Sequence, residues 1–234
     1  MELISPEQML LLPLWYVAFL LAVTCHEAAH AWAAWIGGDP TAYAGGQVTL
    51  NPLPHIRREP FGTVLVPMLT YVLMGWTMGW ASAPYDPYWE ERHPRRAAAM
   101  ALAGPLANLA LAVLAFGVLK AGIAGGWWMR PGTGISQVTL TSSAPGWASG
   151  LAMFASICLL INCVLFLFNL FPVPPLDGAT VVAGLGSWGA SYRDAVQSSF
   201  SFMGLIVAWV LFSQIGGPLF GVLVALVHPG GIYR

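Results

Sequence analysis

The sequence predicts an all-α, polytopic membrane protein. Of its 234 residues, 57% are apolar and only 8% are charged, whereas a soluble domain usually carries about 25% charged residues. A chain of this composition has too few charged side chains to cover its surface in water. Several apolar segments also reach the roughly 20 residues that a helix needs to cross a bilayer. We therefore expect an integral multi-pass protein of the cell (cytoplasmic) membrane, surrounded by the lipid bilayer.

Five apolar segments are long enough to be predicted as transmembrane helices. They cover about residues 9–36, 61–80, 97–120, 151–171 and 200–227. A shorter helix is expected over about 178–186, which brings the prediction to 5–6 helices. The connecting segments are polar and rich in Gly and Pro, as is typical of loops.

The segment after the first span is too polar to cross a membrane. The first span ends at 37–40, where the sequence GGDP is a strong helix stop. Residues 47–50 have the pattern of a short strand. We predict a small re-entrant β-hairpin here, whose backbone must be covered by protein or line a water-filled cavity.

The charge argues against a nucleic-acid-binding protein, and the cysteines argue against a protein held together by disulfides or by cysteine-bound metal. The net charge is −1, so nothing indicates a nucleic-acid partner. The three cysteines lie in apolar stretches without disulfide or metal-ligand spacing, and we interpret them as packing residues. They are Cys25, Cys158 and Cys163.

Two acidic residues lie within or at the end of an apolar segment, where ionisable side chains are rare. Glu27 is inside the first span and Asp177 is at the break after the fourth, whereas the other eight acids are near the terminus or in polar loops. His26 and His30 flank Glu27 in the sequence HEAAH. An ionisable side chain at membrane depth is costly and marks a functional site by default.

The sequence HEAAH predicts a zinc site. On a helix, residues four apart project from the same face, so His26 and His30 can bind one Zn²⁺. Glu27 can then reach a water molecule at the metal as a general base. The alternative is a polar network in which the histidines pair with Glu27, as in a proton relay. Burial in an apolar span favours the metal, because a cation offsets the cost of burying these groups.

A catalytic zinc site needs three protein ligands and one open position. Asp177 is the remaining acid at a suitable place, after the Pro-rich break FPVPPLDG, where Gly178 permits a sharp turn. Taken alone, Asp177 would rather be interpreted as the N-cap of a helix that starts near Ala179. Next to HEAAH, the interpretation as third zinc ligand is favoured, with one zinc ion per chain.

Four sequence blocks resemble the site-2 protease family of intramembrane metalloproteases. They are HEAAH at 26–30, NPLPH at 51–55, ALAGPLAN at 101–108 and NLFPVPPLDG at 169–178. The resemblance implies that His26, His30 and Asp177 bind zinc and that Glu27 is the general base. It also implies that Asn169 lines the site and hydrogen-bonds the substrate or the oxyanion. No role is assigned to His55.

The resemblance, which covers about residues 20–185, also implies an activity. The expected enzyme is a zinc-dependent endopeptidase that cleaves peptide bonds within or next to transmembrane segments of membrane protein substrates. We expect a single domain over 1–234, with a catalytic core over about 9–186 and a C-terminal transmembrane helix over about 200–227. The family's larger accessory domains are not expected.

Two other functions fit the same buried residues. A metal or proton transporter would use the histidines and acids along a continuous polar path, but the remaining spans offer few ionisable groups. A proteolytically inactive membrane scaffold would keep the fold without the chemistry. The intact HEAAH and LDG sequences argue against the scaffold.

Overall fold

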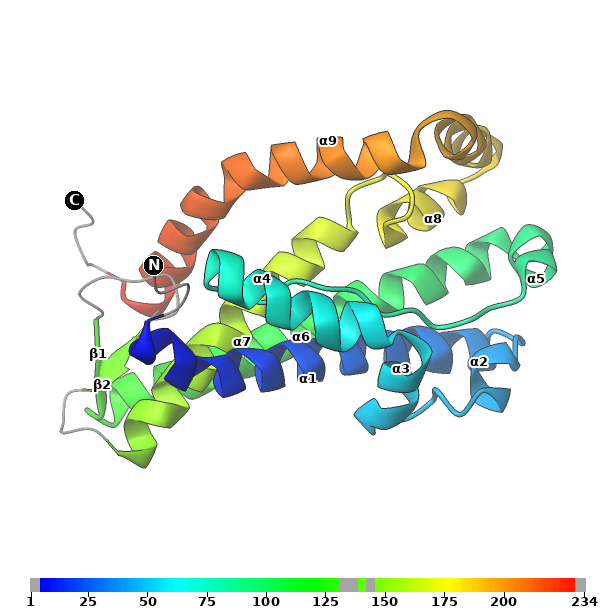
Figure 1. The fold of residues 1–234 in the computed structure, drawn as a ribbon. Coiled ribbons are helices and arrows are strands. Elements are labelled where there is room, and N and C mark those ends of the chain that lie inside the picture. Colours follow the sequence, from blue (N-terminus) through cyan, green and yellow to red (C-terminus); the bar gives the residue numbers. More distant parts are fainter. Residues whose placement is uncertain (1–4, 131–138, 142–145, 230–234) are drawn as a thin grey trace.

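The computed structural model describes residues 5–130, 139–141 and 146–229, and most of this described chain is helical (Figure 1). The four long helices are α1 (Pro6–Ile36), α6 (Pro94–Ala124), α7 (Trp147–Asn169) and α9 (Ser187–Val227). The short helices are α2 (Thr41–Ala44), α3 (Pro52–Arg58), the π-helix η1 (Phe61–Leu65), α4 (Val66–Met74), α5 (Pro87–Arg92) and α8 (Asp177–Ala183). A two-residue antiparallel pair, β1 (Trp128–Met129) and β2 (Leu140–Thr141), completes the described elements.

Three helices of the described chain are long and apolar enough to cross a membrane. They are Gln8–Ile36 within α1, and the whole of α6 and α7. The prediction of a helical membrane protein is therefore confirmed. The predicted number of 5–6 spans is not confirmed, because the other apolar helices of the described chain, Phe61–Met74 and Gly217–Val227, are shorter than a span.

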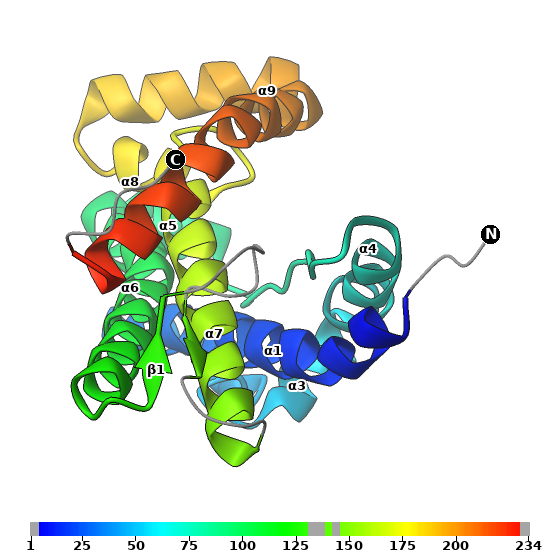
Figure 2. The ribbon, with the colours of Figure 1, turned by 90° about the vertical axis from the view of Figure 1, so that its left-hand side faces the viewer.

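Helices α1, α6 and α7 pack against one another around a common apolar core. Trp15 and Phe19 of α1, Leu119 of α6 and Ile157 of α7 are each at most 2% exposed. Figures 1 and 2 both show α9 on the side of this group that is farther from α1. The three helices thus form the frame in which the HEAAH residues lie.

The outward face of α6 is apolar. It exposes Leu106, Leu109, Val113, Leu114 and Val118, each at least 37% accessible. Such a continuous apolar face is unfavourable in water and favourable against lipid chains. The composition and these exposed faces therefore agree that the protein is a membrane protein.

The predicted span over 61–80 is too long, because the chain turns back after residue 74. Gly75 ends α4 in the left-handed conformation, with φ of 78°, which glycine adopts without a Cβ penalty. The returning segment then packs along η1 and α4: Trp80 N–H donates to Gly62 O at 3.1 Å, and Met78 N–H donates to Thr70 Oγ1 at 2.9 Å. The apolar character of 75–80 reflects this packing rather than continuation of a helix.

The predicted β-hairpin at 47–50 is wrong. This segment is a bend between α2 and α3, and the described strands are the two residues each of β1 and β2. Two helix-capping features explain the difference. Gly46, with φ of 71°, ends the turn of α2, and the Asn51 side chain accepts from Leu53 N–H at 3.0 Å to begin α3. Too few residues remain between these caps for paired strands.

The two C-terminal helices differ from their predicted limits. Asp177–Ala183 form α8, close to the predicted 178–186. The predicted helix over 200–227 lies inside α9, which begins earlier, at Ser187, and continues through Pro218. Gly189, in the first turn of α9, approaches the backbone of Val182 in α8 so closely that a Cβ would overlap the Val182 carbonyl. The missing side chain allows α9 to turn sharply against α8.

The carboxylate of Asp39 joins the end of α1 to the segment before α5. One oxygen accepts from the Thr41 hydroxyl at 2.5 Å and from Thr41 N–H at 3.0 Å, and the other accepts from Asp86 N–H at 2.8 Å. Burial by itself would raise the pKa of Asp39, but these hydrogen bonds from Thr41 and Asp86 lower it below the ordinary value.

Replacing Asp39 with asparagine is expected to lower the free energy of unfolding by about 1 to 3 kcal/mol at pH 7, since an NH₂ group would then face a backbone N–H. The lowered pKa stabilises the fold at pH values above the ordinary aspartate value of about 3.9 and loses this effect as pH falls through the lower folded value. The difference in thermal unfolding between wild type and Asp39→Asn in detergent should therefore shrink below about pH 4. A difference that grows as the pH falls would contradict this assignment.

Candidate metal centre

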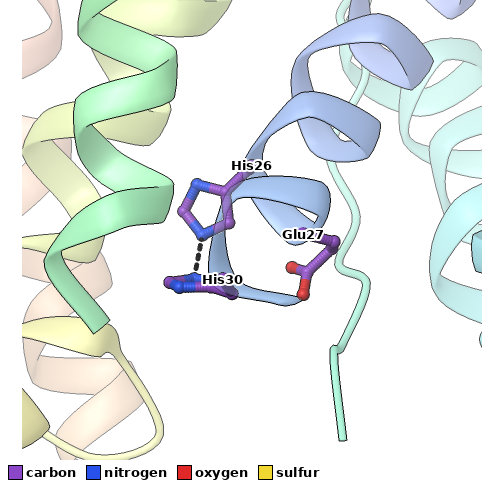
Figure 3. A group of neighbouring side chains, drawn as sticks. All are labelled: His26, Glu27 and His30. Carbon is purple, nitrogen blue, oxygen red and sulfur yellow. Dashed lines mark hydrogen bonds between the residues drawn. The ribbon is translucent and has the colours of Figure 1, made fainter. Parts of the chain in front are cut away.

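Helix α1 places the two histidines of HEAAH on one face, as the spacing predicts (Figure 3). Their Nε2 atoms are 2.9 Å apart, and the imidazole rings meet edge to face with centroids 4.5 Å apart. Both side chains are buried, with His26 6% and His30 8% exposed. The imidazoles extend toward α6, so the site lies inside the helix group and not on its outer surface.

The other nitrogen of each imidazole has its own hydrogen-bond partner on α6. His30 Nδ1 lies 2.8 Å from the carbonyl oxygen of Met100, and His26 Nδ1 lies 2.6 Å from Oδ1 of Asn108. A backbone carbonyl oxygen only accepts, so His30 must carry its proton on Nδ1. In the neutral imidazole that a metal binds, its Nε2 is then the unprotonated nitrogen, and it faces His26 Nε2.

The carboxylate of Asp177 meets both histidines. Its oxygens lie 3.1 Å from His26 Nε2 and 3.2 Å from His30 Nε2. The N-cap of α8 is Leu176, without a side-chain cap, and Asp177 is the first residue of the helix. The interpretation of Asp177 as an N-cap is therefore wrong, and its side chain points into the helix group.

The break before α8 explains how Asp177 reaches the histidines. After α7 ends at Asn169, the chain folds back so that Gly178 lies against the carbonyl oxygens of Leu170 and Phe171. A Cβ at position 178 would overlap both carbonyl groups. Only glycine permits this close turn, which directs the preceding carboxylate back toward α1.

The convergent atoms fit a metal cation. Two imidazole Nε2 atoms and the Asp177 carboxylate meet at 2.9–3.2 Å, and among the described residues the buried Asp177 Oδ2 makes no hydrogen bond beyond its 3.1 Å contact with His26 Nε2. Ligand atoms at about 2.0 Å from a tetrahedral zinc ion lie about 3.3 Å from one another. As neutral imidazoles and a carboxylate, these groups present acceptors at nearly this spacing, and a cation between them would satisfy all of them.

Gly104 of α6 leaves the space beside the two Nε2 atoms open. A Cβ at this position would lie 2.6 Å from His26 Nε2 and closer still to His30 Nε2. No side chain larger than hydrogen can stand there without displacing an imidazole. Helix α6 therefore both holds the histidines through their Nδ1 atoms and keeps the opposite side of the rings free.

Glu27 lies next to this cluster. A carboxylate oxygen of Glu27 and one ring nitrogen of each histidine all lie within 4.8 Å of one another, and Figure 3 shows the carboxylate beside His30. The side chain is 6% exposed, and no described residue hydrogen-bonds to it. It can therefore accept a proton from a water molecule at the cluster.

Two further residues of the sequence blocks lie elsewhere. Asn169, at the end of α7, donates from Nδ2 to Leu165 O at 3.0 Å, and no hydrogen bond joins it to the described histidines or to Asp177. His55 is fully buried in α3 and its Nε2 lies 3.1 Å from Thr49 O. His55 thus holds the bend that was predicted as a strand.

Sequence reasoning missed three residues that contact the cluster or its supports. Gly104 and Asn108 lie in the block ALAGPLAN, where the small Gly104 predicts only that helices approach closely and Asn108 has no predicted role; Asn162 of α7 lies outside the four sequence blocks. The signal was present for both asparagines: each is a polar side chain in the middle of an apolar span. A small residue at 104 is typical of close helix packing, but the sequence does not reveal that the imidazoles of α1 are the groups that need the space.

Comparison with known proteins decides the family. The sequence profile described as Peptidase family M50 matches residues 14–211. The chain belongs to peptidase family M50. This confirms the resemblance to site-2 proteases, because the match includes all four sequence blocks.

Several relatives carry zinc metalloprotease names. "Putative zinc metalloprotease YwhC" of Bacillus subtilis is 32% identical over 201 residues, which cover 86% of this chain and 81% of the relative. "Putative zinc metalloprotease Rip2" of Mycolicibacterium smegmatis is 30% identical over 68% of this chain, which spans about half (52%) of that protein. Rip2 of Mycobacterium tuberculosis strain H37Rv is 28% identical over 92% of this chain and 73% of its own length. No solved structure matches the chain significantly.

Proposed function

We propose that this M50 protein is a zinc-dependent intramembrane endopeptidase. In this proposal His26, His30 and Asp177 bind one Zn²⁺ per chain, and Glu27 is the general base. The substrates are transmembrane segments of other membrane proteins, and the enzyme lies in the cell membrane. The zinc metalloprotease names of the relatives and the three apolar helices support this assignment.

One observation carries the proposal. Two imidazole Nε2 atoms and a carboxylate meet at 2.9–3.2 Å inside a group of helices long enough to cross a membrane. Two of these groups come from α1 and the third from the first residue of α8, more than a hundred residues later in the chain. The fold brings together three acceptors that a metal ion satisfies, with a free carboxylate beside them.

The chemistry divides between the ion and the protein. When bound, zinc lowers the pKa of a water molecule toward about 7 and polarises a carbonyl group. Glu27 accepts the proton of the attacking water and passes it to the leaving amine. Glu27 lies next to His30, and no described side chain hydrogen-bonds to it. Both carboxylate oxygens are therefore available for this transfer.

Asn169 is proposed to donate a hydrogen bond to the substrate carbonyl or to the oxyanion that develops from it. A carboxamide has two N–H donors, and one of them already binds Leu165 O. The remaining N–H is the donor for this role. The side chain is partly buried at the edge of the break that carries Asp177.

A groove beside the HEAAH turn offers a place for the substrate. It has a volume of about 520 Å³ and is lined by α1, by residues 48–50 and by α6. Ala28 and Ala29, between the two histidines, form part of its wall together with Trp32. Because the lining is apolar and reaches the HEAAH residues themselves, we propose that the groove binds the apolar segment of a transmembrane substrate.

The test uses the purified full-length protein in lipid vesicles with synthetic transmembrane peptides. Wild type should bind zinc and release peptide fragments. Glu27→Gln should retain zinc but cleave at least about 100-fold more slowly, as expected for loss of a general base. Removal of zinc with a chelator should abolish cleavage, and addition of zinc should restore it.

Two results would count against proteolysis. Glu27→Gln that retains zinc and cleaves as fast as wild type would show that the general base is wrong. Zinc uptake into vesicles that persists in Glu27→Gln, without peptide cleavage by wild type, would favour the transporter.

A further inference from the structure

Two buried asparagines connect His26 to the neighbouring helices. Asn108 of α6 is 0% exposed and Asn162 of α7 is 1% exposed. The side chains of His26, Asn108 and Asn162 form a continuous chain of hydrogen bonds across three helices: His26 Nδ1 to Asn108 Oδ1 at 2.6 Å, and Asn108 Nδ2 to Asn162 Oδ1 at 2.9 Å. Burying such groups among apolar helices is costly unless each bond is made.

The direction of this hydrogen-bond chain is fixed by backbone oxygens at two points. Asn162 Nδ2 lies 2.9 Å from Cys158 O, and Asn108 Nδ2 lies 3.2 Å from Ala22 O. A backbone carbonyl oxygen only accepts, so the atom that faces it must be an NH₂ group. The amide oxygen of Asn162 therefore faces Asn108, and the amide oxygen of Asn108 faces His26.

The orientation of the two carboxamides determines the tautomer of His26. Because Asn108 presents an oxygen to Nδ1, His26 must donate from Nδ1, and in the neutral imidazole that a metal binds its Nε2 is then the unprotonated nitrogen that faces Asp177 and His30. The same tautomer of His30 is imposed by the Met100 carbonyl, which belongs to the backbone. His26 differs from His30 because its tautomer depends on side chains that can be replaced.

We propose that Asn108 and Asn162 are positioning residues that set the tautomer of His26 for metal binding. Asn108 holds the Nδ1 proton, and Asn162 acts through Asn108 by fixing the orientation of its carboxamide. The inference rests on the proposed metal site but not on proteolysis. Groups that hydrogen-bond a metal-binding histidine typically change metal affinity about 10- to 100-fold when they are removed.

Zinc affinity of the full-length protein in detergent, measured by competition with a chelating dye, tests the proposal. Asn108→Ala should weaken zinc binding about 10- to 100-fold. Asn162→Ala, which removes no contact to either histidine, should weaken it in the same direction but less. The double variant should be no weaker than Asn108→Ala alone, because Asn162 has no route to the metal except through Asn108.

A matched control separates this role from helix packing. Ser156→Ala also removes a buried polar side chain from α7, where the Ser156 hydroxyl donates to Ala152 O at 2.7 Å. It should lower thermal stability without changing zinc affinity. If the asparagines only join the helices, Asn162→Ala should behave like Ser156→Ala, and the proposal is overturned.

The tautomer can be measured directly without a variant that destabilises the protein. Nitrogen-15 NMR of histidine-labelled, zinc-loaded wild type, with the His26 signal assigned through His26→Gln, should show a proton on Nδ1 of His26. A proton on Nε2 would overturn the proposal. A wild type that binds no zinc would refute the metal site itself, whereas zinc binding and cleavage unchanged in both asparagine variants would refute only the role of the asparagines.

Discussion

Replacing Gly104 with alanine is expected to abolish zinc binding and peptide cleavage together. The added Cβ would stand 2.6 Å from His26 Nε2 and closer to His30 Nε2, so at least one imidazole must leave its place. The loss of zinc affinity should exceed the about 10- to 100-fold effect of residues that only support a ligand. Alanine favours a helix over glycine by about 1 kcal/mol, so the helix itself should not be weakened.

The same helix provides the control for this substitution. A Cβ on Gly117 would meet no atom within 4 Å, so Gly117→Ala changes helix propensity without entering any site. It should bind zinc and cleave peptides like wild type. Equal zinc affinity in Gly104→Ala and Gly117→Ala would show that the space beside the histidines is not where the metal lies.

Replacing Asp177 with alanine is the second change with a large expected effect. It removes the carboxylate that lies 3.1 and 3.2 Å from the two Nε2 atoms and leaves two ligands where a catalytic zinc site needs three. Zinc affinity should fall by more than about 100-fold, beyond the range for a supporting residue, and cleavage should be lost. Titration with a chelator of known affinity measures this fall.

Asp177→Asn and Asp86→Asn complete the comparison. Asp177→Asn keeps the shape of the side chain but loses its charge, so it should also bind zinc poorly. Asp86→Asn removes an acid whose carboxylate caps α5, away from the described metal cluster, and should retain zinc. Wild-type zinc affinity in Asp177→Ala would mean that the third ligand is another residue.

The fold could be predicted where the sequence signal is local. The spans of α1, α6 and α7 follow from apolar length, and the HEAAH spacing follows from helix geometry. Apolar length was not enough to predict where the helix in 61–80 ends. Residues 75–80 are as apolar as residues that continue a helix, although they turn back and pack beside η1 and α4. The prediction of a strand at 47–50 was wrong because the helix caps at Gly46 and Asn51 leave too few residues between them for two paired strands.

The ionisable residues of the site could be predicted from the sequence, because burying a charged side chain in an apolar segment is costly. Burial cost pointed to Glu27 and Asp177, and the structure brings Asp177 to His26 and His30. The supports of the site were not predictable, since Met100 contributes a backbone oxygen and Gly104 an absent side chain. A small residue at 104 indicates only that helices pack closely there, and a backbone oxygen has no residue-type signature; which groups meet depends on how α6 faces α1.

X-ray absorption at the zinc edge of the purified, zinc-loaded protein tests the central claim most directly. Two imidazoles, one carboxylate and a water molecule predict a shell of four nitrogen and oxygen atoms at about 2.0 Å, with the multiple-scattering signature of two histidines. His26→Ala should remove one imidazole from that signature. A sulfur ligand at about 2.3 Å, such as Cys25 would supply, or a shell without imidazole would contradict the account.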